Sequence, residues 1–109
     1  MHIPSFPFQT LDWTTIPKEP HSGETGMAWW QVQQVGDIRV RMVEYSAGYK
    51  ADHWCSKGHI ILCLEGELQT TLADGRVFIL QPGMCYFVGD ENEAHQSATE
   101  KGCRLFIVD

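Results

Sequence analysis

The chain has 109 residues, of which 43% are apolar and 20% are charged, and its formal net charge is -6 at pH 7. This length fits one domain, and the composition is that of a folded globular protein. Because the eight Lys and Arg residues are scattered along an acidic chain, no basic face is expected, which argues against nucleic acid and an anionic membrane surface as partners.

The N-terminal segment, residues 1–25, is rich in proline and in large apolar residues. Its prolines are Pro4, Pro7, Pro17 and Pro20. They exclude a continuous helix or a central strand. Its large apolar residues are Phe6, Phe8, Leu11, Trp13 and Ile16. These are too many for a free tail, so we predict an extended arm that packs on its own domain or on a partner subunit.

No targeting or membrane-spanning segment is predicted. The N-terminus lacks a basic region followed by an apolar one, and no later window approaches the length needed to span a bilayer. We therefore expect a cytoplasmic protein. The four cysteines include no CxxC pair, so reduced thiols are expected. Three of them, Cys63, Cys85 and Cys103, are expected to be small core residues.

From Met27 onward the apolar residues alternate with polar ones, which is the pattern of β-strands. The expected strands cover residues 27–35, 38–45, 59–64, 67–72, 77–80, 84–88 and 105–108. Gly-containing turns separate them, and no segment shows sustained helical spacing. The sequence predicts one all-β domain over residues 26–109, as a closed barrel or a two-sheet jelly roll that hides strand edges.

Metal-binding residue types gather between Gly48 and Gly66. His53 and Cys55 are two residues apart, which on a strand aims both side chains at one face. His59 follows four residues later. Imidazole and thiolate are both good ligands for first-row transition metals, so this stretch indicates a metal site. The alternative is that these are buried histidines satisfied by hydrogen bonds in the core.

The spacing Gly48-x4-His53-x-Cys55-x3-His59-x6-Gly66 resembles the first motif of the cupin superfamily. The run Leu80-Gln81-Pro82-Gly83, followed by His95, looks like the second motif. The stretches ADHWCSKGHI, GMCYFVGD and LFIVD are also similar to the small cupins described as DHCW-motif proteins, a name that implies no reaction. The resemblance implies a cupin-type β-barrel, or double-stranded β-helix.

By this resemblance the metal ligands are His53, Cys55, His59 and His95. Cys55 stands where many cupins have a second His, and His59 stands where they have Glu. Each of these substitutions replaces one metal-binding residue type with another. Three imidazoles and a thiolate favour a divalent transition metal such as Zn, Fe or Ni over Mg or Ca. If all four bind, the site is closed, as in structural zinc sites. If Cys55 lies aside, open positions remain for water, O2 or a substrate.

A second group of residues is expected at the mouth of the barrel. Arg41, Tyr45, Tyr49 and Trp30 form a candidate substrate pocket in which Arg41 binds a carboxylate. The alternative for Arg41 is an ordinary solvated face of its strand. A Cys-His nucleophilic pair built on Cys55 is the weaker chemical hypothesis, because the sequence carries no sign of an oxyanion hole.

Two functions therefore remain open. The first is a metalloenzyme of dioxygenase, isomerase or lyase type that acts on a small polar molecule inside the barrel. The second is a non-catalytic module in which the metal holds the barrel together or helps to capture a small ligand. The fold alone does not decide between them. A homodimer is expected from the resemblance and from the apolar arm.

Overall fold

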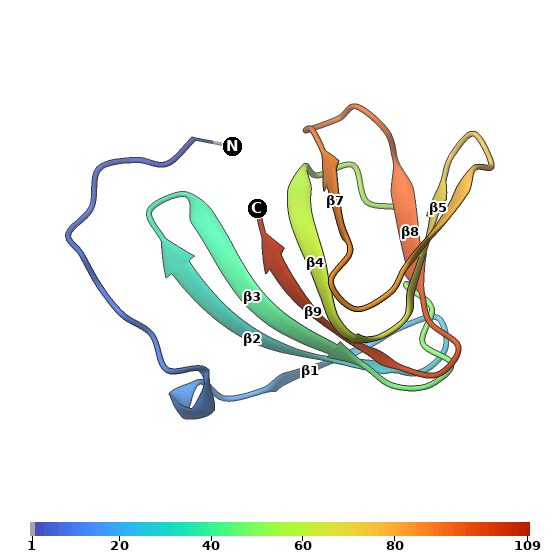
Figure 1. The fold of residues 1–109 in the computed structure, drawn as a ribbon, viewed down its shortest axis with the longest axis horizontal. Coiled ribbons are helices and arrows are strands. Elements are labelled where there is room, and N and C mark those ends of the chain that lie inside the picture. The colour runs from blue at the N-terminus through green and yellow to red at the C-terminus, as the bar shows by residue number, and fades with distance from the viewer. Residues whose placement is uncertain (1) are drawn as a thin grey trace.

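The computed structural model describes residues 2–109 and consists almost entirely of antiparallel β-strands (Figure 1). The strands are β1 (Glu19–Ser22), β2 (Met27–Val35), β3 (Ile38–Tyr45), β4 (His59–Gly66), β5 (Leu68–Leu72), β6 (Val77–Leu80), β7 (Cys85–Val88), β8 (His95–Ala98) and β9 (Cys103–Val108). A short 3-10 helix, η1, covers Trp13–Thr15. Six strands form one sheet in the order β1-β2-β3-β9-β4-β7, and β6-β5-β8 form the other.

The predicted all-β class is confirmed, and two strands were missed. β1 lies inside the predicted arm, at the edge of the larger sheet, where Pro20 removes no hydrogen bond needed by a further strand. β8, with the sequence HQSA, lacks the apolar alternation that marks a strand, and its pairing with β5 decides its conformation. Tertiary pairing therefore overrides the local sequence signal at both places.

The core lies between the two sheets. Its buried residues are Val43, Ile61, Cys63, Leu68, Leu80, Cys103, Leu105 and Ile107. Leu68 and Leu80 come from the smaller sheet, and the others come from the larger one. Cys63 and Cys103 are buried as expected, but Cys85 is exposed, because it begins β7 at the edge of the larger sheet. All four cysteines are free thiols.

The N-terminal arm runs along the β2–β3 side of the larger sheet (Figure 1). The Gln31 side-chain amide on β2 donates hydrogen bonds to the carbonyls of Trp13 and Ile16, at 2.7 and 2.9 Å. The Trp13 ring meets the Phe106 ring of β9 edge-on, with centroids 6.5 Å apart. The arm thus contacts its own sheet, and contact with a partner subunit stays a prediction. Across residues 2–109, no helix is long and apolar enough to cross a membrane.

The centre of the core depends on Leu105, which is 0% exposed and lies on β9 between β3 and β4. We expect Leu105→Ala to lower the free energy of unfolding by about 2–5 kcal/mol, because it removes buried apolar atoms and leaves a cavity. Urea unfolding measures this loss. Phe8→Ala, at a position 94% exposed, is the control and should change stability by less than about 0.5 kcal/mol. Equal losses in the two variants would contradict the core assignment.

Candidate metal centre

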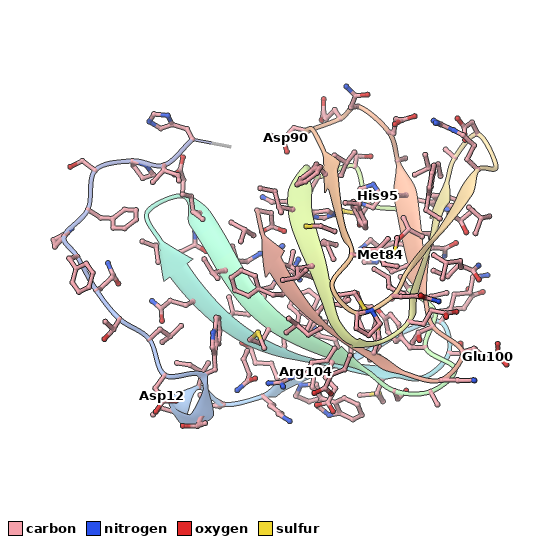
Figure 2. The ribbon with its side chains drawn as sticks, in the orientation of Figure 1. Asp12, Met84, Asp90, His95, Glu100 and Arg104 are labelled. Atoms are coloured by element: carbon pink, nitrogen blue, oxygen red, sulfur yellow. The ribbon has the colours of Figure 1, made fainter. Side chains whose placement is uncertain are left out.

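Three potential metal ligands meet where the two sheets approach each other. Their donor atoms, the Cys55 sulfur and one ring nitrogen each of His59 and His95, all lie within 4.8 Å of one another. The two histidines are buried and Cys55 is half-buried. His59 begins β4, and His95 begins β8 on the side that faces β4 and β7 (Figure 2). The site therefore joins one strand of each sheet.

Backbone pairing places Cys55 opposite His95. The Cys55 N–H donates to the His95 carbonyl at 2.8 Å, and the His95 N–H donates back to the Cys55 carbonyl at 3.0 Å. This isolated bridge anchors the loop before β4 to the first residue of β8. The Cys55 sulfur lies 3.9 Å from the His59 Nε2 atom. A loop residue is thus fixed beside two strand residues.

The hydrogen bonds of the two imidazoles indicate which nitrogens face the centre. His59 places Nδ1 3.2 Å from an Asp109 carboxylate oxygen, and His95 places Nδ1 2.8 Å from the Glu93 carbonyl. Both acceptors require an N–H at Nδ1, so the Nε2 lone pairs converge, 2.7 Å apart. Outward N–H donation to a carboxylate or carbonyl is the usual support of a metal-binding histidine. The donor set and its support therefore fit a transition metal.

Burial also favours the protonation state that a metal needs. Desolvation lowers the pKa of His95 below its ordinary value; the charge of His59 acts in the same direction, while the hydrogen bond to the Glu93 carbonyl opposes it. A lowered pKa keeps the His95 ring neutral near pH 7. Neutral imidazole is the form that binds metal.

The Asp109 carboxylate connects the centre to two arginines of β3. Arg39 donates to both of its oxygens, at 2.9 and 3.1 Å, and Arg41 donates to one at 3.0 Å. Burial alone would raise the pKa of Asp109, but hydrogen bonds from His59 and Arg39, together with the positive charges of Arg41 and Arg39, bring that pKa well below its ordinary value. Asp109 is therefore ionised and holds the His59 ring in place.

The structure does not bring His53 to the other three residues. Its side chain is 68% exposed, and Nδ1 lies 2.7 Å from the neighbouring Asp52 carboxylate. The sequence argument required a strand through His53 and Cys55, and that expectation is wrong, because the backbone bends at Asp52 and His53. Residues two apart then no longer share a face.

The predicted substrate-pocket residues contact one another and other residues of this chain. Arg41 is buried, paired with Asp109, and its guanidinium lies 4.6 Å from the centroid of the Trp30 ring. Tyr45 and Tyr49 stack with ring centroids 4.0 Å apart. Arg41 is predicted to bind the carboxylate of a ligand, but in the structure it binds the carboxylate of Asp109. Contact of these four residues with a substrate stays a prediction.

Sequence reasoning missed Asp109, although a signal for it was present. Cys103, Leu105 and Ile107 alternate as the buried face of β9, and the same period of two carries on to Asp109. Asp109 is 8% exposed, and its side chain is fully covered. A carboxylate at a core position of a strand indicates a buried partner of opposite charge or a hydrogen-bonded site.

Two cavities adjoin the centre. A cavity of about 660 Å³ is lined by His59 and Asp109 together with charged residues of three loops, among them Asp37, Lys57 and Asp90. A smaller cavity of about 210 Å³ is lined in part by His95 and Tyr86. Each of the two buried histidines therefore forms part of a cavity wall.

Solved structures of low sequence identity share this architecture. The polyketide cyclase RemF from Streptomyces resistomycificus is 21% identical with a TM-score of 0.74, over 93% of this chain and 78% of that one. A cupin-like protein from Thermotoga maritima is 17% identical with a TM-score of 0.71, over 83% and 74%. A sugar phosphate isomerase of the cupin superfamily from Silicibacter pomeroyi is 16% identical with a TM-score of 0.70, over 92% and 74%.

No protein-family profile and no curated protein matches the sequence. At the identities of the structural neighbours, the likeness is one of fold, and it agrees with the two motifs around His59 and His95. The chain has the cupin fold.

Proposed function

We propose that the protein is a metalloenzyme in which Cys55, His59 and His95 hold a divalent transition metal, with Zn, Fe or Ni the best candidates. The convergence of the three donor atoms within 4.8 Å, with both imidazoles oriented by outward hydrogen bonds, is the observation that carries the proposal. Two nitrogens and a sulfur suit these metals better than Mg or Ca.

The position of His53 bears on whether the centre is open. With His53 outside the group, three potential ligands remain among residues 2–109 even when the thiolate binds. Structural zinc sites have four protein ligands, whereas catalytic ones have three and leave one position for water or substrate. A Cys-His-His set therefore favours catalysis. The Cys55 thiolate can bind the metal while one coordination position stays open for water or substrate.

The bound metal would supply Lewis acidity toward an oxygen of a small molecule. Asp109 would keep the His59 ring in one tautomer, and Glu93 would do the same for His95 through its carbonyl. We favour an isomerase or lyase reaction over a dioxygenase one, because a thiolate beside activated oxygen is prone to oxidation. The names of two structural neighbours, an isomerase and a cyclase, fit that class.

One observation favours the second candidate, a metal that stabilises the fold. Cys55 lies in an irregular loop that one isolated bridge joins to β8, so a metal would tie this loop to β4 as well. In that case metal removal would lower the thermal midpoint of unfolding, and the protein would have no enzymatic activity with or without the metal. Under the enzyme proposal, turnover of a substrate stops when the metal is removed and returns with it.

The ligand assignment predicts metal content. We expect purified protein to carry about one transition-metal ion per chain, and His59→Ala and His95→Ala to lose it, because each removes a donor atom. Elemental analysis measures this. His53→Ala is the matched control and should keep the metal, since His53 is exposed and lies apart from the group. Full occupancy in both core variants would sink the assignment.

Cobalt substitution tests the thiolate. Protein loaded with Co(II) should show a sulfur-to-metal charge-transfer absorption band if Cys55 is a ligand, and Cys55→Ala should abolish the band. Cys85→Ala, at an exposed position away from the centre, is the control and should leave the spectrum unchanged. A wild-type spectrum without this band would exclude Cys55 from the coordination sphere.

Asp109 is predicted to act as a positioning residue. We expect Asp109→Asn to weaken metal binding by about 10–100-fold, because an amide no longer fixes the His59 ring as a carboxylate does. A competition titration with a chromophoric chelator measures the affinity. Asp37→Asn, a carboxylate on the wall of the larger cavity, is the control. Wild-type affinity in Asp109→Asn would show that Asp109 has only a structural role.

A further inference from the structure

The smaller cavity, of about 210 Å³, lies between β7 and the smaller sheet, with His95 in its wall. Its remaining surface is mainly apolar, with contributions from Leu72, Phe78 and Val88. It is below the range of about 300–1,000 Å³ that is usual for pockets of drug-sized ligands. It can therefore hold a molecule smaller than a drug.

Two buried hydroxyls lining this cavity have no hydrogen-bond partner within residues 2–109. They are Thr70 Oγ1 on β5, at a residue 3% exposed, and Tyr86 Oη on β7. Each hydroxyl can both donate and accept a hydrogen bond. A buried polar group without a partner carries a desolvation cost. A molecule bound in the cavity would remove this cost by forming hydrogen bonds with both hydroxyls.

Tyr86 also lies beside the metal centre. Its ring centroid is 6.0 Å from that of His95 and 6.3 Å from that of His59. The cavity wall therefore combines the two hydroxyls with His95 of the centre.

The charged residues at this cavity are already paired. Arg76 binds Asp74 at 2.8 Å and also binds Glu93, and all three side chains are about half exposed. Among the described residues that line this cavity, Arg76 and Glu93 are thus paired and leave no free charge for a ligand. The apolar walls and the neutral hydroxyls select a neutral molecule with few oxygens.

We infer that this cavity binds a small neutral hydroxyketone, with one oxygen on the metal and the other hydrogen-bonded by Thr70 and Tyr86. The inference rests on the proposed metal centre and adds the substrate class. The hydroxyls would position the molecule, and Cys55, His59 and His95 would hold a metal that supplies Lewis acidity toward its carbonyl.

The test uses Zn-loaded protein and 2-hydroxyacetophenone, a neutral hydroxyketone with an apolar ring, and measures its dissociation constant by ligand-observed NMR. We expect Tyr86→Phe and Thr70→Val each to weaken binding by about tenfold, the usual effect of losing one hydrogen bond to a ligand. Thr71→Val is the matched control. Thr71 is next to Thr70 but on the other face of β5.

A second measurement separates a binding role from a structural one. In metal-free protein, Tyr86→Phe and Thr70→Val should keep or raise the thermal midpoint, because each removes an unpartnered hydroxyl from the interior. Their metal content should equal that of the wild type. Wild-type affinity for the probe in both variants, or no binding by the wild type, would overturn the inference alone. Wild-type protein without metal would overturn the proposed function as well.

Discussion

The buried carboxylate of Asp109 is the interaction on which the centre depends. It accepts hydrogen bonds from Arg39, Arg41 and His59, so it links β3 to β4 across the end of β9. A buried arginine without this anion would carry an uncompensated charge, which is among the most costly defects in a protein interior. The same carboxylate orients the His59 ring. Stability of the sheet and geometry of the ligand group therefore rest on one side chain.

The position of His53 changes what metal binding by Cys55 would mean for the centre. Four converging ligands would make a closed site, and only a displaced thiol would open it. The bend at Asp52 and His53 keeps His53 apart from the other three potential ligands, so under the proposed function a bound thiolate and an open position are compatible. The backbone of one loop, and not the choice of cysteine over histidine, determines how many potential ligands converge at the centre.

The cavity beside His95 contains buried hydroxyls whose desolvation costs free energy, and a purely structural site would not need them. Thr70 and Tyr86 place hydroxyls in the interior that have no partner in the described part of the chain, although valine and phenylalanine would fill similar volumes. Local conflict with good packing is expected where function constrains the sequence. The cupin fold hosts many activities, so these residues, and not the fold, carry the argument for a particular ligand.

The sequence by itself determined most strand positions and the types of potential metal ligand. Alternating apolar residues predict β2, β3 and the buried face of β9, because a half-buried strand imposes a period of two. The spacing around His59 and the distant His95 pointed to one shared site. Only the tertiary structure decided that His53 lies apart, that Asp109 orients His59, and that Tyr86 adjoins a cavity. Each of these depends on a loop bend or on contacts between residues distant in sequence, and local periodicity carries no information about either.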